Sequence, residues 1–186
     1  MSTLSYIKKF IKDRDVASIT PTSLRAVKNV CSRIDFSKDL LLVEYGPGDG
    51  VFSKYILEQM TQGSRLILIE SNSDFVDQLR RSILDERVEV HNILAGDVLE
   101  ILPEEMIGQV DYVLSGIPFS FLDDKRKRDV LRATKRILKK GGTFLAYQTS
   151  GHLKQAVLEV FGNLETDFEV LNFPPYLIYD VVKKQD

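Results

Sequence analysis

Residues 39–50 place a glycine-rich segment, EYGPGDG, directly behind the apolar run DLLLV. Glycine adopts positive φ without steric cost, and it lets a backbone come close to a neighbouring group. A tight turn accounts for one such residue, but Gly46, Gly48 and Gly50 are three in alternate positions. The segment therefore predicts a strand-to-helix turn that approaches a nucleotide-type ligand at the carboxyl edge of a sheet.

Short apolar runs recur along the chain, and several are apolar at successive positions, which is typical of strands buried on both faces. These runs are DLLLVEY (39–45), RLILIE (65–70), RVEVHN (87–92), VDYVLS (110–115) and GTFLAYQT (142–149). Between them, apolar residues are spaced as on one face of a helix, for example Phe52, Tyr55, Ile56 and Met60. This alternation predicts an α/β fold, a mostly parallel sheet with helices on both faces.

The last part of the chain departs from this alternation. DFEVLNF (167–173) and YLIYDVV (176–182) flank Pro174 and Pro175. This pattern predicts a terminal hairpin and therefore one antiparallel strand, which completes a seven-stranded sheet. Gly141 and Gly142 predict the end of the preceding helix.

Composition limits the class of protein. With 186 residues, of which 44% are hydrophobic, we expect one domain over residues 1–186. We find no apolar run of transmembrane length and no signal peptide, so we expect a cytoplasmic protein. The single Cys31 and two histidines predict no metal site.

The charge of the chain is unevenly distributed. Residues 1–39 carry eight Lys or Arg and four Asp or Glu, whereas the net charge of the chain is −2. Nucleic acid is therefore the less expected partner.

The spacing of the glycines distinguishes two kinds of nucleotide site. A dinucleotide site favours a further glycine at position 51, which is Val51. The observed spacing, from Glu44 through Gly46, Gly48 and Gly50, resembles motif I of class I S-adenosylmethionine-dependent methyltransferases. The resemblance implies a Rossmann-like fold, S-adenosylmethionine as cofactor, and a loop of Tyr45 and the glycines that lies against the amino-acid part of the cofactor. It also implies that Glu44 helps to order this loop.

Two further strand ends fit this interpretation. Glu70 ends the second predicted strand, where an acid can accept hydrogen bonds from both ribose hydroxyls. Ser71, next to it, is also predicted to bind the cofactor. The segment AGDVLE follows the third strand, and the resemblance places Asp97 at the adenine amino group with Val98 beside it. An exposed loop carboxylate is the alternative for either acid.

The fourth strand is followed by SGIPF, Ser115 to Phe119, which occupies the place of motif IV in amino-methylating relatives. In adenine N6-methyltransferases an Asn or Asp at the first position of that motif accepts a hydrogen bond from the target amino group. Aligned on Pro118 and Phe119, that position is Gly116. We predict Ser115, Pro118 and Phe119 as catalytic-site residues. Phe119 would offer an aromatic face to a cationic amine, and packing of its ring in the core is the alternative.

The chain most resembles the bacterial phospholipid N-methyltransferase family, which is related to the rRNA adenine dimethyltransferases. The segments EYGPGDGVFSKYIL, VLSGIPF and NFPPYLIYDV carry this resemblance nearly from end to end. It implies N-methylation of an amino head group such as that of phosphatidylethanolamine. An rRNA adenine N6-methyltransferase, a small-molecule methyltransferase and a cofactor-binding domain without activity remain alternatives.

Residues 1–35 are predicted to form N-terminal helices that cover the cofactor cleft or contact a membrane. Residues 4–12 place Leu4, Ile7 and Phe10 on one face of a helix, beside lysines. Such a basic amphipathic helix is typical of peripheral membrane contact. Further on, the resemblance places Thr22 near the methionine end of the cofactor.

Overall fold

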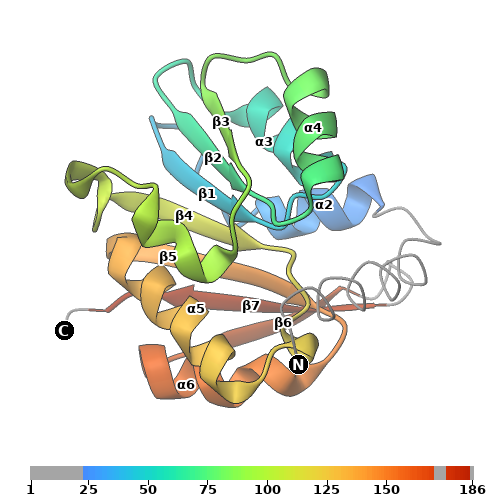
Figure 1. The fold of residues 1–186 in the computed structure, drawn as a ribbon. Coiled ribbons are helices and arrows are strands. Elements are labelled where there is room, and N and C mark those ends of the chain that lie inside the picture. Colours follow the sequence, from blue (N-terminus) through green and yellow to red (C-terminus); the bar gives the residue numbers. More distant parts are fainter. Residues whose placement is uncertain (1–22, 170–174, 185–186) are drawn as a thin grey trace.

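The computed structural model describes residues 23–169 and 175–184. In this part of the chain, seven strands form one sheet in the order β3-β2-β1-β4-β5-β7-β6 (Figure 1). The strands are β1 Leu41–Tyr45, β2 Arg65–Ile69, β3 Val88–His91, β4 Val110–Ser115, β5 Leu138–Gln148, β6 Glu165–Glu169 and β7 Tyr176–Val182. The predicted seven strands are thus confirmed.

Parallel pairing joins β3, β2, β1, β4 and β5, whereas β7 pairs antiparallel with both β5 and β6. The predicted antiparallel hairpin at the end of the chain is therefore confirmed. Tyr45 of β1 pairs with Ser115 of β4, which in turn pairs with Ala146 of β5. The segments that follow these three strands consequently emerge side by side at the carboxyl edge.

Helices cover both faces of the sheet (Figure 1). α2, α3 and α4 enclose a core around Leu42 and Leu114 on one face, and α5 and α6 enclose another around Val43 and Phe144 on the opposite face. The α-helices are α2 Leu24–Cys31, α3 Val51–Gln59, α4 Ser73–Ser82, α5 Asp124–Ile137 and α6 Lys154–Phe161. Short 3-10 helices are η1 Ala95–Glu100, η2 Glu104–Met106, η3 Phe119–Phe121 and η4 Gly151–Leu153.

The helix starts follow from local hydrogen bonding. The side chains of Asn72 and Asp123 accept hydrogen bonds from N–H groups in the first turns of α4 and α5. Such caps satisfy backbone groups that have no partner within the helix. The N-cap of α3 is Gly50, which supplies no side-chain oxygen. The first turn of α3 therefore begins without a side-chain cap at the end of the glycine segment.

The predicted helix end at Gly141 and Gly142 is wrong. α5 ends at Ile137, and the chain passes directly into β5 at Leu138. Both glycines lie inside β5, near a shift in its register with β4. A Cβ on Gly142 would lie 2.8 Å from the carbonyl oxygen of Val110. Close approach of the two backbones, and not a helix cap, thus explains the glycine at position 142.

Several predictions concern residues outside the described ranges. These are the amphipathic helix over residues 4–12 and the cofactor contact of Thr22. Within the described ranges, no helix is both long enough and apolar enough to span a membrane.

Candidate functional site

The glycine segment between β1 and α3 forms the predicted tight loop. Gly46, Gly48 and Gly50 all have positive φ, at 67°, 61° and 80°. The Gly50 N–H donates to the carbonyl of Pro47 over 3.0 Å, and the Gly46 N–H donates to Ile69 of β2 over 2.8 Å. The loop is therefore tied to the end of β2 and folded back on itself at Pro47.

Glu70 closes this loop from the side of β2. Its Oε2 accepts a hydrogen bond from the Gly48 N–H over 3.1 Å, and its Oε1 accepts one from the Asn72 N–H over 2.9 Å. The residue is 2% exposed. A buried carboxylate with these two partners holds the loop against the end of β2.

Glu44 lies beneath the loop on the α2–α3 side. The Ser53 hydroxyl donates to Oε2 of Glu44 over 2.6 Å. Its Oε1 is buried and has no hydrogen-bond partner among the residues that the structure describes. Burial raises the pKa of the Glu44 carboxyl to about 7, and repulsion by Glu70 and Asp49 acts in the same direction. Oε1 of Glu44 is thus a buried polar atom that no described residue satisfies.

Tyr45, also predicted to bind the cofactor, turns its side chain to the opposite face of the sheet. The ring is fully buried, and its hydroxyl accepts a hydrogen bond from Thr134 of α5 over 3.3 Å. Burial raises the pKa of this phenol. The backbone carbonyl of Tyr45 accepts the Gly116 N–H over 2.9 Å. Tyr45 therefore reaches the loop region through its backbone.

The remaining predicted cofactor residues follow β2 and β3 at the same edge. Ser71 is partly exposed directly after Glu70. Asp97 is partly exposed in η1, whereas the side chain of Val98 is fully buried in the core against α5. Only the backbone of Val98 is therefore available to a ligand in this arrangement.

The three predicted catalytic residues, at the end of β4 and just after it, differ in burial and packing. Ser115 is fully buried, and its hydroxyl has no partner within the described part of the chain. Pro118 is partly exposed. The ring of Phe119 is fully buried and meets Phe144 edge-on, with 6.4 Å between ring centroids. Of the two interpretations of Phe119, core packing is the one that this arrangement supports, because no ring face is open to a substrate.

Gln148, at the end of β5, holds this segment in place and was missed from the sequence. Its Oε1 accepts the Phe119 N–H over 3.1 Å, and its Nε2 donates to the carbonyls of Ile117 and Tyr147 over 2.9 and 2.8 Å. The side chain is 5% exposed. A polar residue that ends an apolar strand was the signal that could have identified it.

An aromatic cluster lies beside the same segment. The rings of Phe52 and Tyr147 stack with centroids 4.5 Å apart, and Tyr176 packs against Tyr147 at 5.3 Å. Tyr176, at the start of β7, therefore lies beside the end of β5. Phe52 and Tyr147 were missed, because each fits the apolar pattern of its own helix or strand. Their proximity depends on the tertiary fold.

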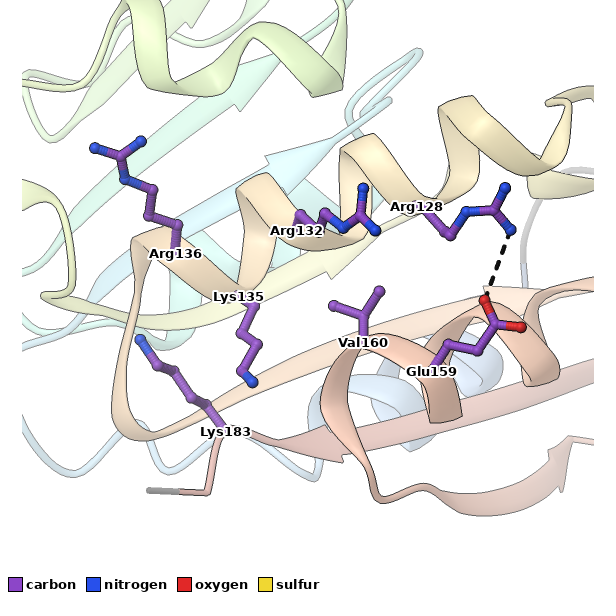
Figure 2. A pocket seen from close by; sticks show the side chains of 7 residues that line it. All are labelled: Arg128, Arg132, Lys135, Arg136, Glu159, Val160 and Lys183. Atoms are coloured by element: carbon purple, nitrogen blue, oxygen red, sulfur yellow. Dashed lines mark ion pairs between the residues drawn. The ribbon is translucent and has the colours of Figure 1, made fainter. Parts of the chain in front are cut away.

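A basic groove of about 490 Å³ lies elsewhere, between α5 and α6 (Figure 2). Its only acidic lining residue, Glu159, pairs with Arg128 over 3.6 Å. The groove reaches Lys183, which follows β7 at the amino edge of the parallel strands. It is therefore separate from the loops that follow β1, β2 and β4. No group of metal-ligating side chains occurs among the described residues.

The sequence of residues 42–142 matches the family described as methyltransferase domain. The chain belongs to this methyltransferase family. It is an enzyme that uses S-adenosylmethionine. The glycine loop, the Glu44 Oε1 that has no partner among the described residues, and the carboxylate of Glu70 fit this cofactor, which carries amino and hydroxyl groups as hydrogen-bond donors.

Two curated methyltransferases illustrate the range of similar sequences. An ornithine lipid N-methyltransferase from Singulisphaera acidiphila is 28% identical over 175 residues, which cover 91% of this chain and 90% of the relative. The ribosomal RNA small subunit methyltransferase A of Mycoplasma capricolum is 28% identical over 102 residues. This second match covers 53% of this chain and 36% of the relative.

Solved methyltransferases share the fold at low sequence identity. The 1,6-didemethyltoxoflavin-N1-methyltransferase of Burkholderia thailandensis, with S-adenosylhomocysteine bound, superposes with a TM-score of 0.70 at 14% identity. That match covers 97% of this chain and 86% of the other. An N-methyltransferase from Haemonchus contortus, in complex with phosphomonomethylethanolamine and S-adenosylhomocysteine, gives a TM-score of 0.67 at 12% identity, covering 88% and 53%.

Proposed function

We propose that this methyltransferase N-methylates the amino head group of a membrane lipid, such as phosphatidylethanolamine or a related amino lipid. The observation that carries the proposal is the match to a lipid N-methyltransferase over 91% of this chain and 90% of the relative. The match to the ribosomal RNA enzyme covers only 36% of the length of that protein. Gly116 also supplies no acceptor side chain of the kind that adenine methylation uses.

The cofactor would be held by the edge that carries the glycine loop. Glu70 and Ser71 would face the ribose, Asp97 and the backbone of Val98 the adenine, and Glu44 the amino-acid part. When bound, S-adenosylmethionine supplies an electrophilic methyl group, whose bond to sulfur breaks with its electron pair left on sulfur while the amine lone pair forms the new N–C bond. The other predicted contacts are Thr22 and the backbone of Tyr45, Gly46, Gly48 and Gly50.

The chain itself mainly has to position the amine and exclude water, because an in-line displacement needs no nucleophilic side chain. Gln148 supports this role, since its three hydrogen bonds hold the segment from Ile117 to Phe119 against the end of β5. Residues 4–12 would bring the enzyme to the lipid surface through a basic amphipathic helix.

The proposal can be tested with methyl-labelled S-adenosylmethionine and a mixed extract of cell lipid and RNA. We expect label in the organic phase, in a product that migrates as a methylated amino lipid. Ribonuclease-sensitive label in the aqueous phase would instead favour the rRNA adenine alternative. Label in a small soluble product would point to a small-molecule substrate. Cofactor binding without any transfer to lipid would contradict the proposal.

A further inference from the structure

The side chain of Tyr147 occupies the space that a side chain at Gly116 would need. β1 and β4 end side by side at Tyr45 and Ser115, and Ser115 pairs with Ala146 of β5, which continues for two more residues. The next residue along each strand is Gly46, Gly116 and Tyr147. A Cβ on Gly116 would collide with the hydroxyl oxygen of Tyr147 and would lie 2.9 Å from its Cζ. Of Gly46, Gly116 and Tyr147, Tyr147 alone carries a side chain. Its hydroxyl lies over Gly116.

This hydroxyl lies at the place where open α/β sheets bind their ligands. β1 and β4 are neighbours at the middle of the sheet. From β1 the chain goes on to β2 in one direction across the sheet, and from β4 it goes on to β5 in the opposite direction. The crevice between two such neighbouring strands is the usual ligand site, at their carboxyl ends. The carbonyl oxygen of Gly46 would lie 3.2 Å from the same Cβ position on Gly116. The Tyr147 hydroxyl thus lies at the carboxyl ends of β1 and β4, next to Gly46 and Gly116.

Two ring contacts orient Tyr147. Phe52 of α3 stacks on its ring at an interplanar angle of 18°, and Tyr176 of β7 packs against it at 46°. Gln148, the next residue of β5, donates to the Tyr147 carbonyl over 2.8 Å and holds the backbone at this position. Because the ring contacts come from two other elements, the hydroxyl is held in position before any substrate arrives.

We propose that the Tyr147 hydroxyl accepts a hydrogen bond from the N–H of the lipid amine, an inference that rests on the proposed function. A tyrosine hydroxyl has one proton and two lone pairs, so it can donate within the protein and still accept from a substrate. The hydrogen bond would direct the nitrogen lone pair toward the methyl group. The nitrogen becomes positively charged as the N–C bond forms, and a proton then leaves it to water. Tyr147 itself makes and breaks no covalent bond.

The contact between Tyr147 and Gly116 bears on the class of substrate. Because the phenol fills the space at Gly116, no acceptor side chain fits at that position. The Gly116–Tyr147 pair would therefore select an aliphatic primary or secondary amine.

Tyr147→Phe tests this inference, because it removes the hydroxyl and keeps the ring. With labelled S-adenosylmethionine and phosphatidylethanolamine vesicles, we expect kcat to fall about tenfold to a hundredfold, the loss typical of a hydrogen bond made in the transition state. Cofactor affinity by calorimetry and the unfolding midpoint should stay at wild-type values. Tyr55→Phe, which removes a phenol from a partly buried ring of α3, is the matched control and should retain full turnover.

The degree of methylation of the lipid separates a substrate contact from a structural role. Monomethylated phosphatidylethanolamine keeps an N–H, so Tyr147→Phe should impair its methylation similarly. The dimethylated lipid in its neutral form has no N–H to donate, so its methylation by the variant should approach the wild-type rate. Equal losses on all three lipids, or no loss on any, would overturn the inference and leave the proposed function standing. No lipid transfer by the wild type would overturn both.

Gly116→Ala provides a second variant. Its Cβ would displace the Tyr147 hydroxyl, so the expected fall in turnover on phosphatidylethanolamine is similar. The two changes remove the same interaction, and the double variant should therefore lose little more than either single variant. Losses that multiply would show that the two residues act separately and would overturn the inference.

Discussion

The Gly48 N–H donates to the Glu70 carboxylate over 3.1 Å, so an acid at the end of β2 holds the middle of the loop that follows β1. The same carboxylate binds the Asn72 N–H at the start of α4. One buried side chain thus links two strand ends at the predicted cofactor edge. This arrangement shows that Glu70 orders the loop, and the proposed function adds a contact with the cofactor.

Glu70→Ala is expected to weaken S-adenosylmethionine binding about tenfold to a hundredfold, as for the loss of a hydrogen bond to a charged group. Isothermal calorimetry would measure the change in Kd. Glu70→Gln keeps an oxygen that can accept the Gly48 N–H, so it should retain more affinity than the alanine variant. An unchanged Kd for Glu70→Ala would remove this residue from the cofactor site.

Gly46→Ala is expected to impair both the loop and the segment after β4. Positive φ costs a residue with a Cβ about 1–2 kcal/mol. The new Cβ would also lie 2.7 Å from Cγ2 of Ile117, and such overpacking costs about 1–3 kcal/mol more. Chemical denaturation would measure the loss of stability, and calorimetry the loss of cofactor affinity.

Gly162→Ala is the matched control for Gly46→Ala. Gly162 ends α6 with φ of 74°, and no atom lies within 4 Å of its would-be Cβ. This variant should lose only the stability due to positive φ and should bind cofactor normally. Equal losses of stability and affinity in the two variants would contradict the proposed contact between the glycine loop and Ile117.

Stability should depend on pH through Glu44. Its pKa is raised from 4.5 to about 7 in the folded protein. The folded state therefore holds this proton more tightly than the unfolded state, and the stability that it contributes is present below pH 4.5 and lost as pH rises through about 7. At 1.36 kcal/mol per pKa unit, the loss amounts to about 3 kcal/mol.

Glu44→Gln removes this titration, so the variant should gain stability relative to the wild type between pH 5 and pH 8. Urea denaturation of the cofactor-free protein across that range would measure the difference. Glu58→Gln, which changes an exposed glutamate of α3 in the same way, should show no such trend. A constant difference between wild type and Glu44→Gln across the range would contradict the raised pKa.

Phe119→Ala should chiefly destabilise the fold. Removing a fully buried phenylalanine costs about 3–5 kcal/mol. Phe168→Ala, at a ring that is 55% exposed on β6, should change stability little. Denaturation would measure both variants, and turnover would be compared per folded molecule. A stable Phe119→Ala protein with low turnover would return this ring to the substrate site.

The sequence allowed the cofactor edge to be predicted because its markers are local. Glycines at positions 46, 48 and 50 can be recognised from their spacing after an apolar run, and Glu70 from its place at the end of the next one. Gln148 and Tyr147 carry no such local signal. They reach the segment after β4 only because β5 pairs with β4 in a particular register.

Phe119 shows the limit of sequence reasoning most clearly. A phenylalanine after a strand end suits both a substrate surface and a core, since the apolar character of the ring is the same in either place. Its burial against Phe144 depends on how η3 turns over the α5–α6 face. The alternation of strands and helices and the spacing of the glycines determined the fold class and the cofactor loop, because both depend on neighbouring residues. The tertiary structure decided which side chains surround Gly116, because those residues are far apart in sequence and meet through strand pairing and packing.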